Sequence, residues 1–170
     1  MDDSTFWNII ETAARAAGGD ADATTDGVRV RLTHLQPGEI ESFQTILGKM
    51  LNLAYSYPLW GAAYLINGGC SDDGFEYFRC WLITRGRETF EAALAEPDSL
   101  AGVVTPDEED SEHECESLLY VARRAYETVA GVKMAAGGRG QARKPSGSAW
   151  DFDDQDERAR RLPRLASLYP

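Results

Sequence analysis

Hydrophobic residues recur every three or four positions along much of the chain, which is the spacing of one buried helix face. In residues 4–17 this pattern ends at Gly18-Gly19, a pair that stops a helix, and a second stripe runs through residues 36–55 behind Pro37. The pattern predicts a mainly α-helical, single-domain bundle of five to seven helices. Further apolar or helical segments are expected at 59–66, 73–85, 87–95 and about 112–130.

One short stretch departs from helical spacing. In residues 28–32 the apolar side chains Val28, Val30 and Leu32 alternate with arginines, which is typical of a short β-strand. The polar residues 18–27 before it are expected to form a loop. The sequence therefore leaves room for one minor strand pair beside the helices.

The helical stripes also identify side chains that should fill the core. A chain of 170 residues can bury such a core without disulfides or a structural metal. The predicted core residues are Phe43, Leu47, Phe75, Phe78, Leu82, Leu118, Leu119 and Tyr126.

Composition divides the chain into three segments. Residues 1–130 carry the helical patterns and are interpreted as the helical domain. Residues 131–148 contain four basic residues, five glycines and no acidic residue, which favours a flexible linker. Residues 149–170 form a distinct tail that we expect to dock on the domain, with Trp150 and Phe152 as buried aromatic anchors before a short amphipathic helix.

The charge of the chain narrows its partners. Twenty-eight acidic residues against 17 basic ones give a net charge of -11. Nucleic acids and anionic membranes bind positive surfaces, so neither is an expected partner. An acidic surface instead favours a protein or peptide partner, especially a basic one, and a small-molecule partner stays open.

Cysteine usage and the apolar runs bear on location. Cys70, Cys80 and Cys115 are odd in number and widely spaced, which fits neither a disulfide framework nor a zinc site. The first residues lack the charged and apolar regions of a secretory signal. No run of about 18 apolar residues could span a membrane. We therefore expect a cytoplasmic protein.

Chemically versatile side chains concentrate in residues 57–87, around the Gly68-Gly69 turn. The turn lacks the GxxxxGK[ST] and GxGxxG spacings of phosphate-binding loops. Asp72 and Asp73 point about 100° apart on a helix, so they are poorly placed to share an ion; neither a metal nor a cofactor is expected. The candidate binding residues are Trp60, Tyr64, Asn67, Cys70, Asp72, Asp73, Tyr77 and Arg79.

Two arrangements are possible for the start of the helix after this turn. If Asp73 is the N-cap, Glu76 three residues later completes a capping box, and Asp72 lies outside the helix with its charge available. If Ser71 is the N-cap, both aspartates lie in the first turn and interact with the helix dipole. The reciprocal Glu76 favours the Asp73 arrangement, which places Asp72 first among the candidate residues.

These residues also carry a resemblance to a known family. The run from Leu59 to Asp98 contains WGAAYLINGGCSDDGFEYFRCWLITRGRETFEAAL. This run, the Phe6-Trp7 helix, residues 114–122 and the Trp150–Asp154 tail resemble the bacterial DUF4240 family, a domain of unknown function. The resemblance implies a helical domain and supplies no activity, substrate or catalytic residue.

Two functions remain open from the sequence. The favoured hypothesis is a non-catalytic binding or regulatory protein that recognises a protein or peptide partner through the 57–87 surface. The alternative is a small enzyme or small-ligand-binding protein with a pocket around the Asn67–Asp73 turn. A deep pocket with an unpaired aspartate pointing inward would favour the alternative, and a flat acidic face would favour the binding protein.

Overall fold

The computed structural model describes residues 1–106, 113–135 and 144–170. Within these ranges the chain forms nine α-helices, two 3-10 helices (η1 and η2) and no β-strand. The predicted helical class is confirmed, whereas the predicted number of five to seven helices is too low. The elements are α1 (Asp3–Ala17), α2 (Ala21–Leu32), α3 (Pro37–Leu53), α4 (Tyr57–Ile66), α5 (Asp72–Thr84), α6 (Arg87–Ala95), η1 (Pro97–Gly102), η2 (Glu116–Tyr120), α7 (Val121–Ala130), α8 (Gln155–Arg161) and α9 (Pro163–Leu168).

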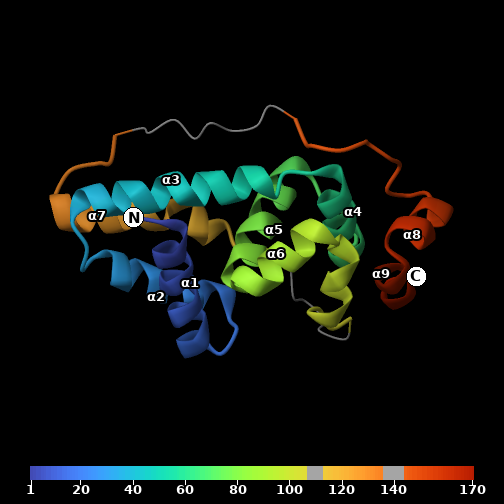
Figure 1. Ribbon diagram of the computed structural model, residues 1–170, viewed down its shortest axis with the longest axis horizontal. Helices are drawn as coiled ribbons and strands as arrows, with labels where there is room; N and C mark the ends of the chain where they lie inside the picture. The colour runs from blue at the N-terminus through green and yellow to red at the C-terminus, as the bar shows by residue number, and fades with distance from the viewer. Residues whose placement is uncertain (107–112, 136–143) are drawn as a thin grey trace.

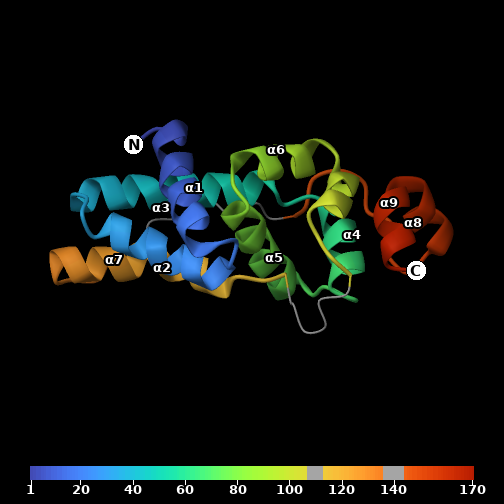
Figure 2. The same ribbon diagram turned by 90° about the horizontal axis from the view of Figure 1, so that it is seen from below.

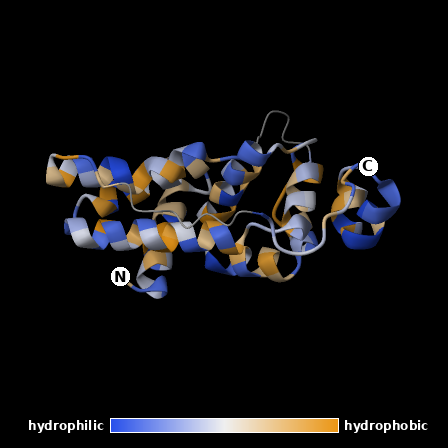
Figure 3. Ribbon diagram, turned by 90° about the horizontal axis from the view of Figure 1, so that it is seen from above, coloured by the Kyte–Doolittle hydropathy of each residue, from blue (hydrophilic) through white to orange (hydrophobic). Residues whose placement is uncertain are grey.

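The helices form an elongated body (Figure 1, Figure 2). α3 and α7 lie side by side along the long axis, with α1 and α2 packed together beside them. α4 and η1 lie towards the other end, where α8 and α9 follow. Hydrophobic and hydrophilic segments alternate along the helices, as amphipathic packing requires (Figure 3). No helix in the described ranges is both long and apolar enough to cross a lipid bilayer.

The predicted strand at 28–32 is wrong because these residues form α2. Of the predicted loop at 18–27, only residues 18–20 lie outside the helices. Asp20 caps this helix by accepting a hydrogen bond of 2.6 Å from the Ala23 amide. Val28 and Leu32 are four residues apart and buried, whereas Val30 is 49% exposed. A Cβ on Gly27 would lie 3.1 Å from the Ala13 Cβ, so the glycine permits α1 and α2 to pack closely.

The expected helix at about 112–130 is divided into two elements. Ser111, the expected start of its capping box, lies outside the described residues. The chain instead forms η2 and then α7, which ends at Gly131 with φ of 69° in the left-handed region. This division, the helix α2, the 3-10 helix η1 and a second helix in the tail account for the larger number of helices.

Most of the predicted core is confirmed. Seven of the eight residues are at most 3% exposed. Tyr126 is only partly buried, because its neighbour Ala125 occupies the inward position on α7. Residues 57–87 contribute many fully buried side chains because α4 and α5 pack into the same core as the other helices.

The C-terminal residues pack against α4 and η1. Leu162 and Leu165 are 2% and 0% exposed. The buried carboxylate of Asp98, from η1, accepts the backbone amides of Arg164 at 3.1 Å and Leu165 at 2.9 Å, which caps α9 from a distant part of the chain. Part of the expected linker, residues 136–143, lies outside the described ranges.

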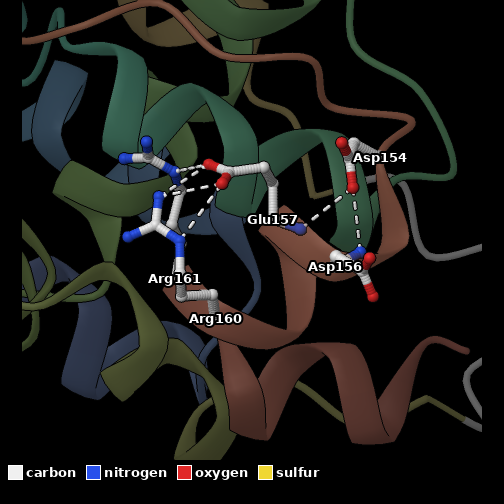
Figure 4. Close-up of polar contacts among 5 residues, drawn as sticks. All are labelled: Asp154, Asp156, Glu157, Arg160 and Arg161. Atoms are coloured by element: carbon white, nitrogen blue, oxygen red, sulfur yellow. Dashed lines mark hydrogen bonds and ion pairs between the residues drawn. The ribbon is translucent and has the colours of Figure 1, made fainter.

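The α8 helix is stabilised by its own charged side chains (Figure 4). Asp154 accepts hydrogen bonds from the amides of Asp156 at 2.9 Å and Glu157 at 3.1 Å. The Glu157 carboxylate binds the guanidinium groups of Arg160 and Arg161. These two hydrogen-bonded cations lower the pKa of Glu157 to about 2, so the ion pairs persist well into acid.

Candidate functional site

Trp60 joins α4 to the start of α5. Its indole Nε1 donates a hydrogen bond of 2.9 Å to the Cys70 carbonyl, and its ring stacks on Phe75 at 4.9 Å between centroids. The Tyr57 ring lies nearly parallel to it at 6.4 Å. Trp60 therefore holds the turn between the helices in place, which is a structural role for a residue that the sequence placed among the binding candidates.

Ser71, and not Asp73, is the N-cap of α5. The Ser71 hydroxyl accepts the Gly74 amide at 3.1 Å, and the backbone of Ser71 is extended. Asp72 and Asp73 thus both lie in the first turn, where the helix dipole favours carboxylates. Asp72 also accepts a hydrogen bond of 3.1 Å from the Tyr55 hydroxyl, so the predicted inequality of the two aspartates has a different cause.

The Ser71 cap predicts that substitutions at Ser71 and Asp73 lower the free energy of unfolding by different amounts. Replacing Ser71 by alanine is expected to lower the free energy of unfolding by about 1 kcal/mol, because the Gly74 amide loses its acceptor. Replacing Asp73 by alanine removes an exposed charge from the first turn and should cost about 0.5 kcal/mol. Urea denaturation of the two variants measures both values. A larger loss for Asp73→Ala would rule out the Ser71 cap.

Cys70 is a poor nucleophile in this environment. It is partly buried, and burial, aided by the negative charge of Glu114, raises the pKa of its thiol to about 12. Only the thiolate attacks electrophiles, and this thiol stays protonated at neutral pH. The geometry gives no support to a Cys70 nucleophile.

Alkylation kinetics can test the protonation of Cys70. At pH 8 we expect iodoacetamide to modify Cys70 at least about a hundredfold more slowly than an unstructured cysteine, because so little thiolate is present. The rate should keep rising with pH up to the limit of stability, since the raised pKa lies far above 8. Peptide mass spectrometry distinguishes Cys70 from the buried Cys80 and Cys115. A rate that levels off below pH 9 would contradict the raised pKa.

Arg79 is used inside the protein. It is 3% exposed, and its guanidinium donates hydrogen bonds to the carbonyls of Leu51 at 2.7 Å and Phe75 at 3.2 Å. The same group lies 4.6 Å from the centre of the Tyr55 ring. Burial lowers the pKa of Arg79, because desolvation disfavours its charged form. Arg79 therefore joins α3 to α5 and does not face a ligand.

Asn67 and Tyr64 lie at the other end of the turn. Asn67 is the C-cap of α4, and its amide atoms are shielded from solvent with no hydrogen-bond partner in the described part of the chain. The Tyr64 hydroxyl donates a hydrogen bond of 3.0 Å to Asp153, and this contact raises the pKa of the phenol. Tyr64, Asp153 and Arg158 line a hollow of about 460 Å³ between α4 and the tail.

Tyr77 belongs to an exposed acidic and aromatic face. The start of η2 is joined to α5 here, because the Cys115 amide donates a hydrogen bond of 3.0 Å to the Tyr77 carbonyl. Burial and then the charges of Glu116 and Asp73 raise the pKa of the Tyr77 phenol. The Tyr120 hydroxyl donates a hydrogen bond of 3.3 Å to Glu116. We call these four side chains, Asp73, Tyr77, Glu116 and Tyr120, the α5–η2 face.

The eight candidate residues thus divide into three groups. Trp60 and Cys70 hold the turn between α4 and α5, and Arg79 joins α3 to α5. Tyr64 and Asn67 lie at the end of α4 near the tail. The remaining three candidates, Asp72, Asp73 and Tyr77, lie on the exposed N-terminal half of α5.

Two structural residues escaped the sequence analysis. Gly61 lies inside an apolar run, and Trp150 of the tail sits directly over it, so a Cβ at position 61 would be 2.1 Å from Trp150 Cζ2. A glycine in the middle of a helical run is the signal that could have indicated this close approach. Asp98 is 4% exposed, and its contacts with α9 are 66 and 67 residues distant in sequence, so no local pattern indicates them.

Comparison with known proteins identifies the family. A family model described as a protein of unknown function (DUF4240) matches residues 1–128, about three quarters of the chain. The chain belongs to the DUF4240 family. The DUF4240 match contains all eight candidate residues and most of α7, and it ends before the tail. No curated protein and no solved structure matches this DUF4240 protein significantly.

Proposed function

We propose that this DUF4240 protein is a non-catalytic binding protein that recognises a basic protein or peptide segment through the 57–87 surface, with the α5–η2 face as the contact region. The observation that carries the proposal is the exposed pairing of carboxylates with tyrosine rings on this face. Asp73 and Glu116 are exposed, and Tyr77 and Tyr120 are partly exposed beside them.

The electrostatics of this face favour a cationic partner. The raised pKa of the Tyr77 phenol reflects the negative potential of Glu116 and Asp73 after the effect of burial. The net charge of -11 on the chain adds a long-range field of the same sign. Such a field increases the encounter rate with a positively charged segment and disfavours acidic competitors.

The side chains present also match what lysine and arginine need. Carboxylates accept charge-assisted hydrogen bonds from ammonium and guanidinium groups. The face of the Tyr77 ring can attract a cation, whereas the Tyr120 ring already has the Arg124 guanidinium 5.8 Å from its centre. A partly exposed patch of both kinds can therefore select a basic segment without a deep pocket.

The contacts of the candidate residues around the turn argue against the alternative of an enzyme at the Asn67–Asp73 turn. Cys70 is protonated at neutral pH, and Arg79 is engaged by backbone carbonyls. Asp72 accepts the Tyr55 hydroxyl, and Asp73 lies exposed in the first turn of α5. These observations support the binding protein because Cys70, Arg79 and Asp72 are engaged within the fold, while Asp73 is exposed on the α5–η2 face.

Charge reversal on this face tests the proposal. The variant Asp73→Lys with Glu116→Lys should lose at least about tenfold of its affinity for basic partners, because both carboxylates become repulsive. Glu41→Lys with Glu127→Lys is the matched control, since it makes the same change of net charge at exposed positions on α3 and α7. The readout is quantitative mass spectrometry of proteins captured from a native lysate, followed by titration of the captured basic segment as a labelled peptide. Equal capture by both variants and the unmodified protein would overturn the proposal.

A further inference from the structure

The residues that lead into α8 lie on α4 as a bound peptide would. Ser146 pairs with the turn before α4 through two backbone hydrogen bonds, one from its own amide to the Tyr55 carbonyl and one from the Tyr57 amide to its carbonyl, both 2.9 Å. Pro145 is buried, and Gly147, with φ of 80°, passes close to Pro58. The pairing of backbone groups fixes the path of the segment without depending on its sequence.

Aromatic side chains then provide the specific contacts. The Trp150 indole fills a slot over Gly61, where even a methyl group at the glycine would lie 2.1 Å from Trp150 Cζ2. The Phe152 ring packs against Tyr64 at 5.5 Å between centroids, and Asp153 accepts the Tyr64 hydroxyl at 3.0 Å. We call the surface made by residues 55–64 the α4 groove.

We propose that the α4 groove is a recognition site for an extended peptide with two aromatic residues separated by one position and followed by an acid, and that such a peptide from a partner protein competes with residues 145–153 for it. The chain's own segment, Trp150-Asp151-Phe152-Asp153, shows the pattern that the groove accepts. The occupant in trans is a partner segment with this same chemistry.

Two observations indicate that the chain's own segment is replaceable. The Trp150 Nε1 is buried and has no hydrogen-bond acceptor in the described residues, so the slot is filled with an uncompensated polar group. Trp150 and Phe152, the predicted buried anchors, are also only partly buried. The tail has a separate attachment at α9, where Leu165 is buried and Asp98 caps the helix, so residues 145–153 can leave the groove while α9 stays in place.

The family match covers the groove but not the segment that fills it. Gly61, Tyr55 and Tyr64 lie inside the DUF4240 match, whereas the segment that fills the groove lies beyond residue 128. The groove is therefore part of the matched domain and its occupant is not.

The test uses the full chain and a fluorescein-labelled synthetic peptide with the sequence of residues 145–154. The variant Trp150→Ala with Phe152→Ala empties the two aromatic positions of the groove and leaves the Ser146 backbone pairing in place. We expect the peptide to bind this variant at least tenfold more tightly than the unmodified chain, as measured by fluorescence anisotropy, because its aromatic side chains find these positions free. A peptide with the same two residues replaced by alanine should not bind. Circular dichroism checks that the variant is folded, and the milder pair Trp150→Leu with Phe152→Leu replaces it if it is not.

A glycine variant places the peptide in the proposed slot. Adding Gly61→Ala to the emptied variant should abolish peptide binding, because its methyl group occupies the position of the indole. Gly38→Ala is the matched control, since a Cβ at Gly38 on α3 would meet nothing within 4 Å. Equal binding by the emptied and unmodified chains, absence of binding to both, or binding that survives Gly61→Ala would each overturn the proposal. The probe is acidic, so these results are independent of the basic segment proposed for the α5–η2 face.

Discussion

Replacing Phe75 by alanine is expected to lower the free energy of unfolding by about 3–5 kcal/mol, the range for large-to-small substitutions of a buried aromatic residue. Phe75 is fully buried, and its ring stacks on Trp60 at 4.9 Å between centroids. It also lies under the Arg79 guanidinium, 5.0 Å from the ring centre. The substitution leaves a cavity where α4 and α5 meet and removes the ring on which Trp60 stacks.

Urea denaturation followed by far-ultraviolet circular dichroism measures the effect of Phe75→Ala. Tyr77→Ala is the matched control, because Tyr77 is an aromatic residue on the same helix but is only partly buried. We expect the control to cost about 1 kcal/mol or less. A loss below about 2 kcal/mol for Phe75→Ala would show that the α4–α5 contact closes around the missing ring, and that Phe75 is not central to the core.

The periodic parts of the fold could be predicted because the buried positions of each helix repeat at regular spacing within one segment of the sequence. Phe43 and Leu47 on α3, and Phe75, Phe78 and Leu82 on α5, repeat at helical spacing and are all fully buried. The error at residues 28–32 has the opposite origin. Five residues fit an alternating pattern as well as a helical one, and contact with α1 decides between them, since Val28 and Leu32 both face inward from α2.

Residue types located the candidate region but did not reveal the use of each side chain. Trp60 and Arg79 have the chemistry of binding residues, yet their polar atoms meet the carbonyls of Cys70 and Leu51. Those acceptors are backbone atoms brought close only by the packing of three helices. The sequence therefore shows which side chains can donate a hydrogen bond, but not which acceptor each of them meets in the fold.

The cap of α5 shows a subtler limit. Ser71 and Asp73 are both good N-cap residues, and Glu76 favoured Asp73 on local grounds. The helix instead starts at Asp72, directly after Ser71. In this arrangement the Tyr55 hydroxyl donates a hydrogen bond of 3.1 Å to the Asp72 carboxylate. The Ser71 cap is thus accompanied by a contact between residues 17 positions apart, and the local capping motif does not indicate this contact. The capping of α9 by Asp98 is a still longer-range example.

Replacing Arg79 by methionine is expected to lower the free energy of unfolding by about 2–4 kcal/mol, although methionine nearly matches the length of the arginine chain. The Leu51 carbonyl lies in the last turn of α3, where helical carbonyls lack partners within their own helix. Arg79 Nη1 donates to it at 2.7 Å. Methionine has no donor, so the carbonyl would be left buried and unpaired.

The backbone around Arg79 supports this size of effect. The Ala54 amide donates its hydrogen bond to the Met50 carbonyl, and the Tyr55 amide donates to the Asn52 carbonyl. Neither amide is then available to the Leu51 carbonyl between them, which therefore depends on the guanidinium. Methionine would also give up the contact of the cation with the Tyr55 and Phe75 rings, at 4.6 and 5.0 Å from their centres. Part of this loss is offset, because burial of the charge is itself unfavourable and lowers the pKa of Arg79.

Two control variants separate the charge from its hydrogen bonds. Arg87→Met removes an exposed arginine that pairs with Glu91, and should cost about 0.5 kcal/mol or less. Arg79→Lys keeps the charge but lacks the planar group that reaches Leu51 and Phe75 together, so its loss should fall between the other two. All three are compared by urea denaturation at pH 7. If Arg79→Met is as stable as the unmodified chain, the prediction is wrong, because the cost of burying the guanidinium then cancels its contacts with the Leu51 carbonyl and the two rings.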